Sequence, residues 1–295
     1  MELNATQLSA LTRLFSSAVF KELAKRGRSP LFTRLLKLAN ISTHCDDTNT
    51  VGGVFDTAFS VLKTVGMRSE YVYRAAIAHK IIMGKHSLQT ASMLSEFRAG
   101  TCKADIVVIN GTATAYEIKS ERDSLARLAR QVDNYKKVFA SVNVIASADH
   151  VDGVRGAVSP DVGILCLSRR YQISVIREAL NRPDRICPMT VFESLRTAEA
   201  ASILKALGIK VSDVPNTQRH AVMRSCFANL RPIDVHHQMV RTLKRTRNLA
   251  PLHELINQLP SSLHAAALSV PVCRRDQSRL VDAVKTPLSL AFSWS

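Results

Sequence analysis

The chain has 295 residues, of which 46% are hydrophobic and 22% charged, and its 40 Lys and Arg against 24 Asp and Glu give a net charge of +16. This length and hydrophobic content allow one large domain or a core domain with helical additions, and they exclude a low-complexity chain. The basic excess favours a polyanionic partner, because Lys and Arg neutralise phosphates and release counterions.

The sequence also indicates where the protein works. No apolar run reaches the ~18 residues of a membrane span, and the first residues lack the basic start and apolar stretch of a secretory signal. The six cysteines include no Cys-x-x-Cys pair, which favours a reduced protein. We therefore expect a cytoplasmic protein with no membrane partner.

Residues 1–85 are expected to form a helical N-terminal region. The expected elements are two helices within residues 8–40 separated near Gly27–Pro30, a loop over 41–53, and helices over about 55–65 and 70–83. The loop contains the run His44-Cys45-Asp46-Asp47, whose side chains are of metal-ligand types. Adjacent residues cannot easily converge on one ion, so we expect a polar loop there, with a metal site as the alternative.

A nuclease-like core is expected over residues 86–180, and its first element is predicted to be a helix from His86 to Phe97, broken by Gly100. Glu96 lies near the end of this helix and is an acidic candidate for the site, with a solvated helix-end glutamate as the alternative. His86 and Arg98 flank the same element. They are candidates for phosphate contact, and a structural or surface role is the alternative.

Two apolar strands around a turn follow, from Lys103 to Lys119. Side chains alternate along a strand, so Glu117 and Lys119 share one face. Asn110-Gly111 is a strong hairpin signal. A two-residue turn would place Asp105 opposite Tyr116, whereas a three-residue loop ending at Thr112 places Asp105 opposite Glu117. We favour the three-residue loop, because it brings two carboxylates together on one face.

Opposed residues of a hairpin have Cβ atoms about 4.5–5.5 Å apart. Two carboxylates at that separation can share one hard cation such as Mg²⁺, and they repel each other without it. An ordinary hairpin with surface charges is the alternative reading of Asp105 and Glu117.

The next segment, from Ser120 to Phe139, is predicted to be a helix. Apolar side chains recur along it at helical spacing: Leu125, Leu128, Val132, Tyr135 and Val138. Gln131 and Tyr135 are four residues apart and therefore share a face of this helix.

Asp105, then Glu117-Ile118-Lys119, then Gln131-Val132-Asp133-Asn134-Tyr135 resembles the PD-(D/E)XK phosphodiesterase superfamily, in the branch that includes lambda exonuclease and RecB-like nucleases. The resemblance covers roughly residues 70–168 and looks closest to uncharacterised bacterial and phage-borne proteins. The proline that names the superfamily is absent, since Ala104 precedes Asp105. Many members lack this proline.

The resemblance implies an α/β fold: a restriction-endonuclease-like central sheet flanked by helices, with helical additions at both ends. It implies Mg²⁺, with Mn²⁺ able to substitute, held by Asp105 and Glu117, with Glu96 as a third candidate ligand. Lys119 would orient the attacking water or offset charge in the transition state. Gln131 would position Lys119 or the phosphate, and Tyr135 would contact the nucleic-acid backbone, with a core aromatic as the alternative.

The rest of the core and the C-terminal region follow. The sequence predicts strands at 142–146 and 162–167, a short helix over 151–158, a boundary at Asn181–Pro188, and a helical basic region over 190–295 with helices at about 191–207, 216–229, 233–247, 250–258 and 276–284. The last dozen residues look weakly ordered. Arg241, Lys244 and Arg245 fall at helical spacing on one face, which indicates either a nucleic-acid contact or a solvated basic surface.

The sequence therefore predicts a Mg²⁺-dependent nuclease acting on nucleic acid, with DNA favoured. Two alternatives stay open: a catalytically inactive nucleic-acid-binding protein of nuclease fold, and a helical regulatory or interaction protein. The bacterial and phage-borne proteins that it resembles suggest a role in phage defence or mobile-element conflict. The pattern does not distinguish exonuclease from endonuclease, and it leaves the oligomeric state open.

Overall fold

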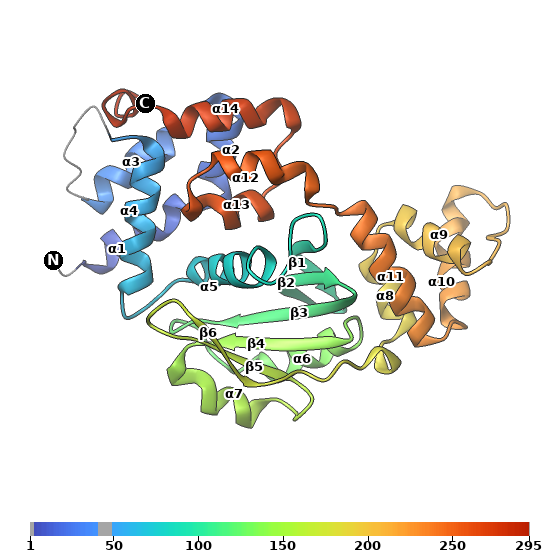
Figure 1. Ribbon diagram of the computed structural model, residues 1–295. Helices are drawn as coiled ribbons and strands as arrows, with labels where there is room; N and C mark the ends of the chain where they lie inside the picture. Colours follow the sequence, from blue (N-terminus) through green and yellow to red (C-terminus); the bar gives the residue numbers. More distant parts are fainter. Residues whose placement is uncertain (1–2, 41–48, 295) are drawn as a thin grey trace. The chain divides into compact units, whose positions relative to one another are not determined.

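The computed structural model describes residues 3–40 and 49–294, and the run His44-Cys45-Asp46-Asp47 lies outside these residues. Contacts divide the chain into two compact units (Figure 1). The first unit runs to Ile81 and includes Arg169–Tyr171 and the chain from Ala250 onward, and the second takes Ile82–Ser168 and Gln172–Leu249. This division differs from the three consecutive regions expected from the sequence, because the last stretch of the chain groups with the N-terminal helices.

The described part of the first unit consists of helices. They are α1 (Ala5–Leu14), α2 (Ser17–Arg26), α3 (Pro30–Ala39), α4 (Val51–Thr64) and α5 (Glu70–Ile77), which continues as a π-helical turn over Ala78–Ile82, and then α12 (His253–Gln258), α13 (His264–Ser269), α14 (Arg274–Lys285) and α15 (Leu288–Ala291). The sequence predicted one helix where α1 and α2 stand. The prediction was wrong because Ser16 ends the first helix and caps the second, its hydroxyl accepting from the Val19 N–H.

The described end of the chain is packed rather than weakly ordered as the sequence indicated. Leu288 and Ala291 are each 1% exposed. The hydroxyl of Thr33 donates to the carbonyl of Ala291 at 2.9 Å, which ties α15 to α3. The weak local signal missed this order because the contacts that create it join opposite ends of the chain.

The second unit contains a six-stranded mixed sheet in the order β1-β2-β3-β4-β5-β6. The strands are β1 (Ser92–Ala99), β2 (Cys102–Asn110), β3 (Thr112–Lys119), β4 (Ser141–Ala146), β5 (Gly163–Leu167) and β6 (Ile173–Arg177). Strands β1 to β3 are antiparallel, β3, β4 and β5 are parallel, and β6 returns antiparallel to β5. The fold class is therefore mixed α/β, as the sequence predicted.

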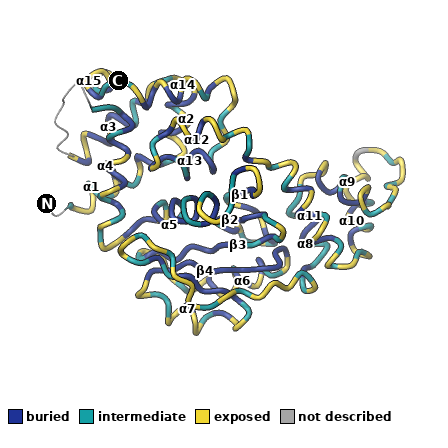
Figure 2. Tube along the Cα trace, in the orientation of Figure 1, coloured by how far each residue is buried: buried dark blue, intermediate teal, exposed yellow. Residues whose placement is uncertain are grey.

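Helices α6 (Leu128–Lys136), α7 (Val151–Ala157), α8 (Pro188–Ser194) and α11 (Pro232–Thr246) lie against this sheet (Figure 1). Helices α9 (Thr197–Ala206) and α10 (Asn216–Ala228) pack on α11 and α8 instead. Helix α6 connects β3 to β4 and α7 connects β4 to β5, as parallel strands require a crossover. Figure 2 shows β4 buried along its length and β3 buried over most of its length. The apolar face of α6 is buried in the same core through Leu128 and Val132.

Two predicted helices and one predicted boundary differ in the structure. Helix α6 begins at Leu128 and not at Ser120, because Asp123 accepts from both the N–H and the hydroxyl of Ser120 and closes a turn. The helix expected over 191–207 is two helices, with Glu199 reaching back to the N–H of Arg196 at the start of the second. Asn181–Pro188 lies inside the second unit rather than at its boundary.

The helix predicted from His86 to Phe97 is also wrong, since strand β1 occupies Ser92–Ala99. Gly100 turns the chain at φ +59, and β1 then pairs with β2 along its length. The apolar spacing of this short segment fits a helix or a strand, and the neighbouring strand decides between them. Strand β6, which was not predicted from the sequence, pairs with β5 in the same way.

Among the helices that the structure describes, none combines the length and the apolar character needed to cross a lipid bilayer.

Candidate functional site

The hairpin of β2 and β3 sets the register of the site. Asn110 pairs with Thr112, and Ile106 pairs with Tyr116. Gly111 forms the tip at φ +70, a left-handed conformation that glycine adopts at little cost. Continuing the register by one residue places Asp105 opposite Glu117, so the register favoured by the sequence is confirmed.

Glu117 and Lys119 form a buried ion pair on one face of β3. Lys119 Nζ lies 2.8 Å from Glu117 Oε1, and the two side chains are 7% and 2% exposed. Gln131 on α6 accepts a second hydrogen bond from Lys119 Nζ at 3.0 Å. Helix α6 therefore fixes the ammonium group at a defined place, which is one of the two roles expected for Gln131.

Tyr135 supports the same carboxylate from the next turn of α6. Its hydroxyl lies 2.6 Å from Glu117 Oε2 and 2.7 Å from the carbonyl oxygen of Lys103. Burial, followed by the charge of Glu117, raises the pKa of Tyr135 above its usual range, so the phenol keeps its proton and donates it. Tyr135 is fully buried and binds a site carboxylate. The sequence favoured a contact with the nucleic-acid backbone, with a core aromatic as the alternative.

The two strands that precede β3 in the sheet carry further carboxylates, Asp105 on β2 and Glu96 on β1. Asp105 Oδ2 accepts a 2.7 Å hydrogen bond from the Ile118 N–H, which fixes its side chain toward β3. Across the other ladder, Ser95 pairs with Ile106 and Phe97 with Ala104, so Glu96 lies opposite Asp105.

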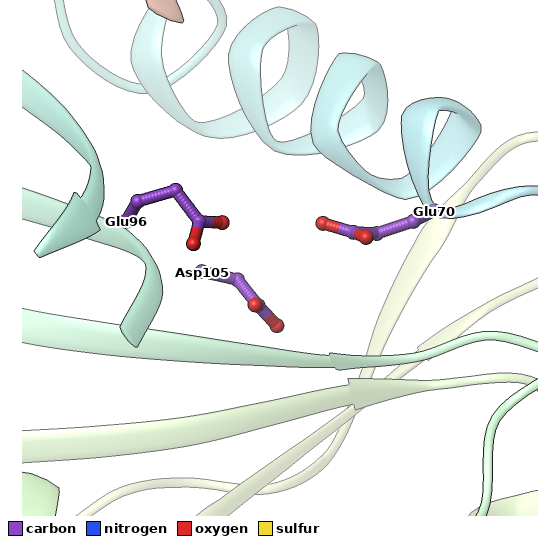
Figure 3. Close-up of side chains that lie close together, drawn as sticks. All are labelled: Glu70, Glu96 and Asp105. Carbon is purple, nitrogen blue, oxygen red and sulfur yellow. The ribbon is translucent and has the colours of Figure 1, made fainter. Parts of the chain in front are cut away.

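Figure 3 shows the side chains of Glu96 and Asp105, and an oxygen of each lies within 4.8 Å of the other. The same figure draws Glu70, the first residue of α5 in the first unit. Glu96 is exposed and Asp105 half-buried. Glu96, which the sequence placed on a helix end, is thus a strand residue directly beside Asp105.

The backbone of Glu96 is in a strained conformation. Its φ is +53, in the left-handed region where a Cβ atom costs roughly 1–2 kcal/mol. Such strain in proteins is concentrated at functional sites, where the surrounding structure maintains it. Here the strained residue is also the one that presents a carboxylate to Asp105.

We expect the free energy of unfolding of Glu96→Gly to be about 1 kcal/mol higher than that of Glu96→Ala. Both substitutions remove the carboxylate and its contacts, but only glycine relieves the left-handed backbone. Urea unfolding of the two variants without metal measures the difference. An alanine variant as stable as the glycine variant would show that this backbone carries no strain.

Glu96, Asp105 and Glu117 therefore stand side by side on three adjacent strands. Their oxygens are the hard donors that Mg²⁺ and Mn²⁺ accept. Both oxygens of Glu117 hold hydrogen bonds, but a carboxylate offers about four lone-pair sites, which leaves room for a ligand bond. Glu96 and Asp105 thus offer a divalent cation oxygens within 4.8 Å of each other, and the strand register places Glu117 next to Asp105 as a third donor, with Lys119 offsetting part of the negative charge.

Basic side chains lie near these carboxylates at the β1–β2 turn. Arg98 pairs across the ladder with Lys103, and both are exposed. Like charges directly opposite each other disfavour strand pairing, and neither residue has an ion pair among the described residues. Arg98 was a candidate from the sequence, whereas Lys103 was not, although it lies only two residues before Asp105.

The other candidate residues lie away from the carboxylates. His86 Nδ1 accepts from the side chain of Asn110 at 2.8 Å, at the tip end of the β2–β3 hairpin. Arg241 and Lys244 on α11 line a hollow beside Gly111. Arg245 instead donates to Ser202 on α9 at 2.7 Å, so the three basic residues predicted to act together are divided between two surroundings.

Comparison with known proteins gives a family. The model of the family described as "Bacteriophage P4 protein cII" matches residues 63–256, more than half of the chain. Protein cII of Enterobacteria phage P4 is 25% identical over 204 residues, which cover 66% of this chain and 75% of the phage protein. No solved structure matches the chain significantly. The matched region includes all three carboxylates, Lys119 and the basic residues of α11.

Proposed function

We propose that this chain, which belongs to the bacteriophage P4 protein cII family, is a divalent-metal-dependent nuclease. The single observation that supports this best is the Glu117–Lys119 pair, held by Gln131 and Tyr135 beside Asp105. Burying a charged lysine and a carboxylate costs desolvation free energy that their attraction only partly offsets. We therefore take the pair as a sign of function. Metal-assisted hydrolysis of a phosphodiester is the reaction for which these groups are suited.

Each residue has a defined part in this proposal. Asp105 and Glu117 would hold the cation, with Glu96 as an additional ligand, and the bound cation would supply a more acidic water and charge stabilisation at the phosphate. Lys119 would orient the attacking water or offset the negative charge that develops on the phosphate oxygens. Gln131 and Tyr135 are positioning residues, since they contact Lys119 and Glu117.

Nucleic acid, with DNA favoured, is the proposed substrate, and a cytoplasmic location is proposed with it. The net charge of +16 supports a polyanion, as do Arg98 and Lys103 near the carboxylates, which form no ion pair with the residues that the structure describes. We also propose a restriction-endonuclease-like fold, which the six-stranded mixed sheet flanked by helices supports. A role in conflict between phages or mobile elements is the biological setting that we propose.

The test is incubation of the purified protein with circular and linear DNA, and with RNA, in Mg²⁺, Mn²⁺ or EDTA. Metal-dependent cleavage is expected, and cleavage of the circular form would identify an endonuclease. Binding of nucleic acid without cleavage in any metal would support the inactive binding protein instead. A protein that neither binds nor cleaves nucleic acid would overturn the proposal and favour a regulatory or interaction protein.

Lys119→Gln is expected to retain Mn²⁺ affinity while losing turnover by at least about a hundredfold. Lys119 is not a proposed ligand, and its removal leaves Glu117 without a competing cation, so metal affinity should be unchanged or higher. Loss of a group that acts on water or on developing charge lowers rates by about 10²–10⁴. Calorimetric titration with Mn²⁺ beside a plasmid-nicking assay measures both quantities. A folded variant that had lost Mn²⁺ affinity would place Lys119 in a different role.

A further inference from the structure

A surface hollow lies between the tip of the β2–β3 hairpin and helix α11. Its lining residues are Gly111, His237, Val240, Arg241 and Lys244, and its volume is about 350 Å³. This is within the range of about 300–1,000 Å³ that is usual for ligand sites. The four helix residues are spaced three and four apart, so they form one stripe along α11. We call this feature the tip groove.

A hydrogen-bonded chain of side chains holds the two walls of the tip groove together. Thr112, next to Gly111, donates its hydroxyl proton to Asn181 Oδ1 at 2.9 Å. Its oxygen lies 3.2 Å from His236 Nε2, so His236 must be the donor there. Burial, with a smaller effect of His237, lowers the pKa of His236 to about 4. His236 is therefore neutral near pH 7. The contact between hairpin and helix is a neutral hydrogen bond, so it leaves the charges of Arg241 and Lys244 uncompensated.

The two cations of the tip groove have no anionic partner in the described part of the chain. Ion pairs do form elsewhere around α11, since Arg231 binds Asp234 and Arg247 binds Glu199. No such pair involves Arg241 or Lys244 among the described residues. A concave surface with two uncompensated cations 3 residues apart has the charge and shape to bind an anion.

The distance from the carboxylates follows from the strand. Gly111 is six residues after Asp105, and a strand rises roughly 3.4 Å per residue, which places the tip groove about 20 Å away along β2. Duplex DNA advances about 3.4 Å per base pair along its axis. For a duplex whose axis runs along β2, this separation corresponds to about six base pairs. The same face of β3 carries Glu117 and Lys119 at one end and Ala113, in the core that includes α11, at the other.

We propose that the tip groove binds the phosphodiester backbone of a nucleic acid about six base pairs from the bond placed at the carboxylates. This proposal rests on the proposed function for the identity of the anion. Arg241 and Lys244 make the phosphate contacts, and Arg245, which binds Ser202, does not. The substrate is thereby held at two places on one hairpin.

The test compares two double variants in an Asp105→Asn background, which prevents cleavage. Arg241→Gln with Lys244→Gln removes both cations of the tip groove. Lys205→Gln with Arg219→Gln removes the same charge from exposed positions on α9 and α10. Binding of a labelled 20-base-pair DNA duplex is measured by anisotropy between 50 and 200 mM salt, concentrations of the order used for such slopes.

The tip-groove variant should lower the slope of log K against log salt by roughly 1.8, about 0.9 for each lost phosphate contact on a duplex. The control variant should keep the parent slope. An unchanged slope in the tip-groove variant, an equal decrease in the control, or a parent that binds no nucleic acid would each overturn the inference.

Cleavage measured separately keeps this inference distinct from the proposed function. If the chain cleaves DNA, the tip-groove variant with Asp105 intact should raise KM and leave kcat unchanged, because these residues touch no reacting atom. If the chain cleaves nothing but the salt slope falls as expected, the tip groove stands and the nuclease proposal fails. If the chain cleaves DNA and the slope is unchanged, the reverse holds.

Discussion

Replacing either member of the buried Glu117–Lys119 pair alone should lower the free energy of unfolding by about 3–5 kcal/mol, because the other charge is left buried and uncompensated. The variants are Glu117→Gln and Lys119→Met, measured by urea unfolding without metal. The double variant Glu117→Gln with Lys119→Met removes both charges together and should recover much of the loss.

This expectation reverses the one that the sequence supports. Two opposed carboxylates in the absence of metal suggest repulsion, and removing one of them would then stabilise the protein. In the structure, Lys119 and Tyr135 both bind Glu117, so replacing Glu117 leaves the buried Lys119 ammonium without its counter-charge. Asp152→Asn, which breaks the exposed pair with Arg155, is the matched control and should cost less than about 1 kcal/mol. Single variants at Glu117 and Lys119 that cost no more than this control would contradict the prediction.

The second large effect is expected on turnover. Asp105→Asn should reduce metal-dependent cleavage by more than about a hundredfold, since a lost ligand charge removes several kcal/mol of transition-state stabilisation. Asparagine keeps an oxygen that can accept from the Ile118 N–H, so the fold should be preserved. Asp105→Ala should also lose activity but cost about 1–3 kcal/mol of stability, because that N–H is then left without its acceptor.

The control for this variant is Asp133→Asn on α6. Asp133 is exposed and lies between Gln131 and Tyr135 in the sequence. Its substitution therefore removes one carboxylate near the site and leaves the proposed ligands in place. Its turnover should equal that of the parent. Equal turnover in Asp105→Asn would remove Asp105 from the site.

Local pattern predicted the part of the site that depends on near neighbours. Strand alternation placed Glu117 beside Lys119, and helical spacing placed Gln131 and Tyr135 on one face of α6. The hairpin register followed from Asn110-Gly111 and from the requirement that the two carboxylates meet. These relations extend over a few residues, so the sequence contains them directly.

The parts that were missed depend on contacts between distant segments. Strand β1 was predicted to be a helix because its apolar spacing fits both structures, and pairing with β2 decides the matter. The position of Glu96 opposite Asp105 follows only from that pairing. The order of the described C-terminal residues comes from contacts such as Thr33 with Ala291, which no local pattern reveals.

The basic face of α11 shows the same limit. Spacing alone puts Arg241, Lys244 and Arg245 on one surface, and the sequence cannot tell which neighbours each will meet. The structure places the first two in the tip groove and the third against α9. His237 and Gly111 were not expected to belong to this surface, because their proximity arises from the packing of α11 on the hairpin.

The central claim is that these carboxylates support metal-dependent hydrolysis of a phosphodiester. Its most direct test is a Mg²⁺ titration of the cleavage rate, starting from EDTA-treated parent protein and a labelled DNA duplex, with Asp105→Asn purified in parallel. We expect no cleavage without metal, a rate that rises and saturates with Mg²⁺, and no comparable rate in Asp105→Asn. Cleavage that proceeds without metal, that is equal in Asp105→Asn, or that never appears in Mg²⁺ or Mn²⁺ would contradict the claim.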